Sequence, residues 1–443
     1  MSTIISTELK REEYQMFDVI RSKRYWLALL LVGAIIGIVS FTFIGIRNSV
    51  KVKQIPVALV NEDKGTLSNK IESKLRKKFN GKDSKIKWVS PQKDGFNDQK
   101  YYGAFIIRSG FSKELQQQNE SLKAQIISQK LTTLQKKEKL PDSAKSKLLQ
   151  AKFKSQLLQA KFVTQKPVHP AQIKISINQG MNAQISQLLS QALPQIVNAL
   201  SSRISAQQQS VLSKNKINLS AKSWDLVSTP ISVSTHESNK IEKNTVNGTA
   251  PMLLVALAWF SALIPSLILW REHTKRSASK FLNATTITSQ LITGLVASIL
   301  SATVAFLFVN VCFNLTIPNP INFIGLMSIS IFVFYLIITC VLDWLGFAFY
   351  PLVLIVWLLA SSVISYAPET LDPLYRKAIY SWVPMRFSMQ TLTNTLYFHN
   401  GSSTTMSSLL VLLIIGFVAA ILMYSSGYLK HYLFTVRPHR KIK

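Results

Sequence analysis

The side chains that carry out most protein chemistry are scattered singly along this chain. Its six histidines and two cysteines form no His-Glu-x-x-His, Cys-x-x-Cys or Gly-x-Ser-x-Gly motif, the spacings typical of metal sites and activated nucleophiles. Gly81-Lys82 lacks the preceding glycine of a phosphate-binding loop, and Asp83 stands where such a loop has Ser or Thr. We therefore predict no catalytic residue, no metal site and no cofactor, and a protein that is not an enzyme.

The elements that would position such residues are predicted to be membrane helices. Between Lys280 and Asp343 lie 62 residues without Asp, Glu, Lys or Arg, in a chain of net charge +30. Lipid explains this contrast, because a charge at the bilayer centre costs at least about 2.5–3.5 kcal/mol. A spanning helix needs about 20 apolar residues, and Pro318 and Pro320 divide the long run, since prolines break a helix interior. Six transmembrane helices are predicted, at residues 25–46, 249–270, 286–311, 322–342, 345–366 and 407–429.

A short turn at Asp343-Trp344 is predicted to join the fourth and fifth of these helices. The turn would place Asp343, the only ionisable residue near a span, at the aqueous edge of the membrane. The alternative is a proton relay inside the membrane, which we favour less because the spans contain no acid–base pair. A chain with neither a relay nor a nucleotide site needs an external source of energy for transport.

Basic residues in the short flanks predict the orientation of the helices. Lys and Arg number five in residues 1–24, four in 271–280 and five in 430–443, so these segments and both termini are predicted to be cytoplasmic. Residues 1–24 are predicted to form an amphipathic helix on the inner surface, the alternative being a plain charged leader. The 202 residues 47–248 are placed outside despite their 34 basic and 13 acidic residues, because long domains translocate regardless of charge.

The external block is predicted to combine a small α/β unit with long helices. Strands are expected at 55–60, 85–90, 102–107 and 171–177, spaced by a helix at 66–79. Segments 113–165 and 181–212 are amphipathic and would pack as a stalk or hairpin, unless one forms a partner-binding or self-associating face. In the second of these segments one side is expected to carry Ile185, Leu189, Leu193, Ile196 and Leu200. The predicted fold is therefore mainly α, a six-span polytopic membrane protein with a large external α/β plus long-helix insert between spans one and two.

The strongly basic composition limits the partners. Nucleic acid is excluded as a partner, because most of the excess charge is on the external block. Membrane lipid and anionic envelope polymers such as teichoic acids are the candidates, and a solvated Lys-rich surface is the alternative. Both cysteines, Cys312 and Cys340, lie in spans, so the external block has no disulfide. With Lys far more frequent than Arg, this composition predicts the cell membrane of a Gram-positive bacterium.

Several strings resemble one family. Val57-Ala58-Leu59-Val60 followed by Asn61, Glu62, Asp63, Lys64 and Gly65, directly after the first span, is similar to the signature of YhgE/Pip-like (phage infection protein) membrane proteins of the type-2 ABC-transporter permease superfamily. Residues 102–107 with Phe111-Ser112, residues 248–252, and Trp382-Val383 with the outer-loop residues Pro384 and Met385 also resemble this family in kind and order. Residues 361–368 lack the family's Gly-rich element, and residues 391–394 lack its usual Arg.

The resemblance implies the membrane-spanning permease subunit of an ABC exporter. Two such subunits would pair as a homodimer or heterodimer, and a separate ATP-binding subunit would dock on their cytoplasmic side. The leader and the 271–280 loop would transmit the motion; the coupling residues are predicted to be Arg271, Glu272, His273, Lys275 and Arg276. A simple positive-inside anchor is the alternative role of that loop. The rival function is a non-transporting envelope protein, either a surface (phage) receptor or a secretion-apparatus scaffold.

Overall fold

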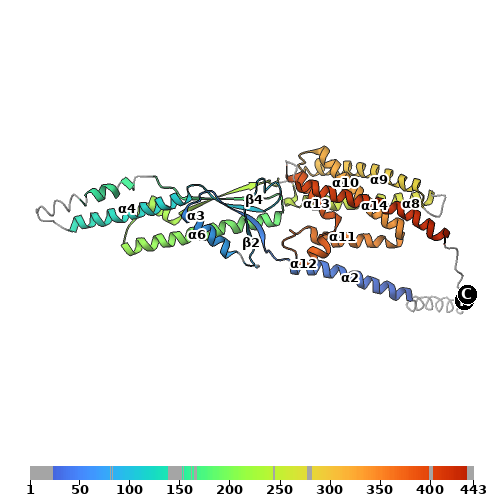
Figure 1. Ribbon diagram of the computed structural model, residues 1–443, viewed down its shortest axis with the longest axis horizontal. Coiled ribbons are helices and arrows are strands. Elements are labelled where there is room, and N and C mark those ends of the chain that lie inside the picture. The colour runs from blue at the N-terminus through green and yellow to red at the C-terminus, as the bar shows by residue number, and fades with distance from the viewer. Residues whose placement is uncertain are drawn as a thin grey trace, which may run out of the picture. The chain divides into compact units, whose positions relative to one another are not determined.

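The chain folds into two compact units in the computed structural model (Figure 1). Residues up to Lys51 and from Asn244 onward form one unit, and Val52–Lys243 form the other. The structure describes residues 23–79, 81, 83–137, 152, 154–160, 162–163, 167–242, 245–276, 282–398 and 403–436. Most of the amphipathic helix predicted for residues 1–24 lies outside the described residues, which begin at residue 23. Residues 437–443 of the predicted basic tail also lie outside them.

The first unit contains six helices, within the described residues, that are long and apolar enough to cross a membrane. They are α2 (Lys23–Ser49), α8 (Ala250–Arg276), α9 (Ala284–Leu307), α10 (Pro320–Leu345), α11 (Tyr350–Ile364) and α14 (Ser403–Val436). A π-helical turn, η2 (Phe308–Cys312), extends α9, and a 3-10 turn, η3 (Phe347–Phe349), leads into α11. The prediction of six membrane helices is confirmed, and the chain is a multi-pass membrane protein.

Helix α10 lies at the centre of this unit and contacts α8, α9 and α14 (Figure 1). Its contact with α8 is aromatic: Trp259 is fully buried, with its ring 5.2 Å from Phe334 of α10 and 6.1 Å from Trp357 of α11. Aromatic side chains bury large apolar areas and pair edge-to-face at such separations. These contacts fix α8 and α11 against the central helix.

The predicted outer loop 367–406 is largely helical. It contains α12 (Pro373–Tyr375), the π-helical turn η4 (Arg376–Tyr380) and α13 (Pro384–Tyr397). Helix α13 is too short to span a bilayer, yet it packs against α8, α10 and α14. Its polar residues conceal this burial in the sequence. They can be buried because they form hydrogen bonds inside the bundle: the Ser388 hydroxyl donates to the hydroxyl of Ser330 on α10 at 2.8 Å, and both are fully buried.

The second unit is built on a five-stranded sheet in the order β2-β1-β3-β4-β5. Neighbouring strands are parallel except for the antiparallel pair β3/β4. The strands are β1 (Ile55–Asn61), β2 (Ile86–Val89), β3 (Gly103–Ile107), β4 (Ala171–Asn178) and β5 (Ile231–Ser238). The first four lie where the sequence predicts them. Strand β5 was not predicted, because it is a mostly exposed edge strand with no buried face to produce an apolar alternation.

Four helices, α3 (Thr66–Lys78), α4 (Phe111–Lys137), α6 (Ala183–Asn215) and α7 (Ala221–Ser228), complete the described part of this unit, with helical residues at 154–160. A 3-10 turn, η1 (Val246–Gly248), precedes α8. Helices α4 and α6 run side by side away from the sheet (Figure 1). Helix α4 covers only the first half of the segment 113–165 that was predicted to pack with 181–212, and residues 138–151 lie outside the described residues. The buried side of α6 differs from the prediction: Val197 is 1 % exposed and continues the row of Ile185, Leu189 and Leu193, whereas Ile196 and Leu200 are half-buried.

Candidate functional site

The residues predicted to form a coupling loop are helical. Helix α8 continues past Trp270 to Arg276, so the loop predicted for residues 271–276 is wrong for this segment. The prediction ended the helix at the first charged residue. Charge ends the apolar span but does not end a helix, because Arg, Glu and Lys are good helix formers and no Gly or Pro interrupts them here.

Two sides of this helix end have different surroundings. Glu272 and Lys275 form a partly exposed ion pair of 3.4 Å along one side. The guanidinium of Arg271 lies 5.9 Å from the ring centre of Phe347 in η3, a cation–π distance. His273 Nε2 lies 3.2 Å from the hydroxyl of Thr293 on α9. Arg276 is the last residue of the helix, and its side chain lies outside the described residues. One side of the helix end is thus available to solvent and the other is joined to its neighbours.

From His273 a series of polar contacts leads into the core. The Thr293 hydroxyl donates to the Ser289 carbonyl at 2.7 Å and also lies 3.3 Å from the Gln290 carbonyl, so its oxygen can accept from Nε2–H of His273. The Tyr335 hydroxyl of α10 donates to the same Gln290 carbonyl at 3.0 Å. The Gln290 side-chain amide in turn donates to Asp343 Oδ1 at 3.4 Å. We call these five residues the polar network; it connects α8, α9 and α10.

The position of Asp343 corrects a second prediction. Asp343 does not lie in a turn: it is inside α10 and only 2 % exposed. The chain turns at Gly346, whose φ of +75° lies in the region that favours glycine. The predicted turn relied on the charge of Asp343 as a sign of the aqueous edge, but the amide of fully buried Gln290 holds the carboxylate inside the bundle. Ionisable residues within membrane helices commonly have a functional role.

Close packing of α9 on α10 holds the network together. A Cβ added at Gly294 would lie 2.5 Å from Cζ and 2.6 Å from Cδ1 of Tyr335, and closer still to its Cε1. Glycine at this position therefore lets the Tyr335 ring lie directly against α9 and reach the Gln290 carbonyl one turn away. No role for Gln290, Tyr335 or Gly294 was predicted from the sequence. A polar side chain such as Gln290 inside the 62-residue uncharged run is the signal that could have indicated the site.

Asn61–Gly65, the string that resembles a family signature, form a turn in the second unit. Asn61 Oδ1 accepts from the backbone N–H groups of Asp63 and Lys64, both at 3.2 Å, as in an Asx turn. Lys64 has a φ of +50°. Glu62 pairs with Arg108 at 3.9 Å. The motif therefore reverses the chain between β1 and α3.

Asp63 connects the beginnings of two helices. Its Oδ2 accepts from Gly65 N, at the start of α3, and from Ser112 N, at the start of α4, both at 3.2 Å. Burial opposes ionisation of this carboxylate, but hydrogen bonds from Ser112, Ser68 and Gly65 together lower its pKa. A Cβ at Gly65 would lie 2.6 Å from Asp63 Oδ2, so this position requires glycine. The motif residues thus contact one another and the sheet edge, which is a structural role.

The outer-loop motif begins α13. Pro384 is the first residue of that helix, a position that suits its fixed φ and missing N–H. Met385 is fully buried. The next residue, Arg386, donates to the Tyr380 carbonyl at 3.2 Å, and its guanidinium lies 4.4 Å from the ring centre of Phe387. The motif therefore anchors a buried helix.

The predicted site residues are divided between the two units. The α8 residues and Pro384-Met385 belong to the first unit, and Asn61–Gly65 belong to the second. Within the described ranges, no three His, Cys, Asp or Glu side chains are grouped so that they could hold a metal ion. The α8 end and the polar network are the only arrangement among the predicted positions that joins exposed charged groups to buried polar ones in the described part of the chain.

A family model described as ABC-2 family transporter protein matches residues 23–424. The match covers five of the six membrane-length helices in full, α14 as far as residue 424, and the whole of the second unit. Comparison with curated proteins and with solved structures gave no match.

Proposed function

We propose, on the premise that the chain belongs to the ABC-2 family of transporter proteins, that it is the membrane-spanning permease subunit of an ABC-type exporter. A separate subunit binds and hydrolyses ATP, and two permease subunits pair as a homodimer or heterodimer. The observation that carries the proposal is the connection from the charged end of α8, through His273 and Thr293, to the buried Gln290–Asp343 contact.

In this mechanism the exposed side of the α8 end is the contact for the ATP-binding subunit. Glu272 and Lys275 are partly exposed and lie one helical turn apart. Helix α8 continues from this pair into the apolar core, with Pro265 inside it. Because neighbouring helices hold a proline-containing membrane helix in shape, a displacement of its end is passed on to the part packed in the core. His273 passes the displacement to α9, and Gln290 passes it to α10. The hydrogen bonds of the buried part cannot be replaced by water in a bilayer, so the three helices move together.

The basic flanks support the orientation of the chain. Arg271, Lys275 and Arg276 at the end of α8, with Lys280 after it, and the residues beyond α14 are rich in positive charge, which favours the cytoplasmic side for both helix ends. The second unit, Val52–Lys243, is then extracellular and both termini are cytoplasmic. The cytoplasmic flanks contact anionic lipid headgroups, which attract basic segments next to a membrane.

The test separates binding of the ATP-binding subunit from transmission of its motion to the membrane helices. The wild-type chain is purified from its own host with the ATP-binding subunit that accompanies it, which mass spectrometry identifies. Glu272→Ala/Lys275→Ala should weaken this association about fivefold to thirtyfold, the equivalent of about 1–2 kcal/mol. His273→Ala should leave the association intact but lower the ATP hydrolysis of the complex, because its side chain contacts α9 and not the exposed side.

Lys377→Ala is the matched control, since Lys377 is an exposed cation of the first unit away from α8. It should behave as wild type in both assays. Association and hydrolysis unchanged in all variants would contradict the proposed role of α8. A preparation that brings down no ATP-binding subunit would favour a non-transporting surface receptor or secretion scaffold instead.

A further inference from the structure

Helix α6 has two apolar sides, and only one is covered by the sheet. Leu189 and Leu193 are fully buried, and their Cδ1 atoms lie 3.4 and 3.5 Å from the position of a Cβ at Gly103 on β3. A second row, made of Ile196, Leu200 and Ile204, recurs every four residues, so it follows one line along the helix. These three side chains are only half-buried.

The second row of α6 lines a groove. Opposite it, α3 contributes Leu75 and Phe79, and the hollow between the two helices has a volume of about 400 Å³. A second hollow of about 380 Å³ continues the first between α4 and α6, and Ile204 and Gln207 line both. We call the two hollows together the α3–α6 groove. From Gln195 to Leu212 it follows α6 for about 26 Å, at 1.5 Å per residue.

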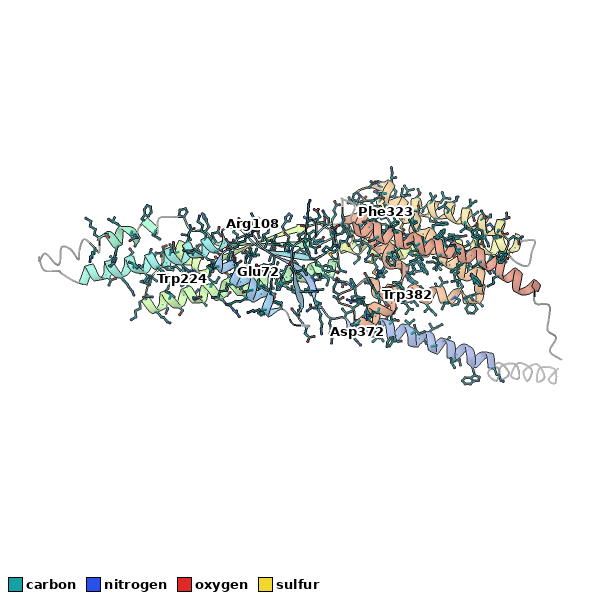
Figure 2. The ribbon with its side chains drawn as sticks, viewed as in Figure 1. Glu72, Arg108, Trp224, Phe323, Asp372 and Trp382 are labelled. Carbon is teal, nitrogen blue, oxygen red and sulfur yellow. The ribbon has the colours of Figure 1, made fainter. Side chains whose placement is uncertain are left out.

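Cations rim the first hollow. Lys74 and Lys78 of α3 and Arg203 of α6 line it, and no described residue lining either hollow is acidic. None of the three is ion-paired with a carboxylate of the described residues. The nearby carboxylate of Glu72 on α3 (Figure 2) is engaged by Arg76 at 3.0 Å. The groove thus combines an apolar floor with three positive charges along the first hollow, and Lys123 lines the second.

We propose that the α3–α6 groove binds a single-chain amphiphile with an anionic headgroup. The acyl chain lies along Ile196, Leu200 and Ile204, and the headgroup lies among Lys74, Lys78 and Arg203. The volume of the groove is that of a small-molecule pocket, whereas a partner helix with its side chains is about 10–12 Å across. An anionic polymer would use the cations but leave the apolar floor uncovered.

Photolabelling of the full chain in nanodiscs of zwitterionic lipid tests this site. The probe is a palmitate analogue that carries a diazirine, and peptides are mapped by mass spectrometry. Label is expected on α3 and α6, with competition by oleate at least tenfold stronger than by uncharged oleyl alcohol. Lys74→Ala/Lys78→Ala/Arg203→Ala should lower this labelling about tenfold. Ala199→Trp, which narrows the groove from an exposed position in its wall, should lower it without removing any charge.

Lys70→Ala/Lys77→Ala is the control, because both lysines are exposed on α3 but do not line the groove. It should label as wild type does. Label on the membrane helices is expected from lipid contact. Label on the second unit only away from α3 and α6, unchanged labelling of the triple variant, or equal competition by a glycerol-phosphate polymer would each overturn the proposal. The assay needs no ATP-binding subunit, so its result is independent of the transport function.

Discussion

Gly294→Ala is expected to separate α9 from α10. The added methyl group would lie 2.5 Å from Cζ of Tyr335, whose ring is 1 % exposed and has no room to retreat. Overpacking of this kind costs about 1–3 kcal/mol. Moving the ring also breaks its hydrogen bond to the Gln290 carbonyl, worth about 0.6–1.7 kcal/mol in a membrane protein. We expect a combined loss of about 2–4 kcal/mol.

Unfolding of the purified chain in detergent, followed by intrinsic tryptophan fluorescence, measures this loss. Gly325→Ala is the matched control on α10, because a Cβ there meets nothing within 4 Å; it should be neutral or stabilise by up to about 1 kcal/mol, the helix propensity difference. Tyr335→Leu should remove most of the penalty of Gly294→Ala, because it takes away the ring. A Gly294→Ala chain as stable as Gly325→Ala, or no such rescue, would refute the packing argument.

Three further predictions concern the second unit, the orientation and the energy source. Asp63→Ala should destabilise the second unit by about 1–2 kcal/mol at pH 7, like loss of a helix cap. Because hydrogen bonds lower the pKa of Asp63, its contribution to stability is complete above about pH 4 and is lost as the pH falls through the lowered pKa. The acid unfolding curves of wild type and variant should therefore converge. In a Cys312→Ser/Cys340→Ser background, Ser155→Cys should react with an impermeant thiol reagent in intact cells and Ser277→Cys should not; the reverse pattern would invert the proposed topology. The purified chain alone should hydrolyse no ATP, and hydrolysis that disappears in Lys82→Ala would contradict the need for a separate ATP-binding subunit.

The membrane helices and most strands were predictable because each has a simple signal. Uncharged runs bounded by Arg and Lys identify helices that cross lipid, and short apolar runs identify buried strands. Charge marks the edge of an apolar span, but it does not mark the end of a helix. For this reason the helix ends predicted at Arg271 and Asp343 are wrong. Arg271 lies in a helix that continues beyond the apolar span, and Asp343 lies inside the bundle, where Gln290 donates to it.

The candidate site itself was only half predictable. The exposed residues Glu272 and Lys275 follow from their position after a span. Their connection to the core depends on which side of α9 faces α8 and α10. The buried side of α9 carries Gln290, Gly294, Ser298 and Ala302 at four-residue spacing, but Thr and Ser residues on its other sides hide this row in the sequence. Glycine in a membrane helix indicates close approach of a neighbour, but the sequence does not identify Tyr335 as that neighbour of Gly294.

The continuous helical course of α8 also relates the directions of its side chains to one another. Each residue of an α-helix is rotated from the one before by about 1/3.6 of a turn. The direction of Glu272 therefore follows from that of Trp259, which packs against Phe334 and Trp357, together with any bend at Pro265 between them. A flexible loop would tolerate an inserted residue at this point. In α8 the same insertion would rotate the Glu272–Lys275 side and His273 together, away from their present neighbours. The number of residues between Trp259 and the charged helix end is therefore as constrained as the identity of those residues.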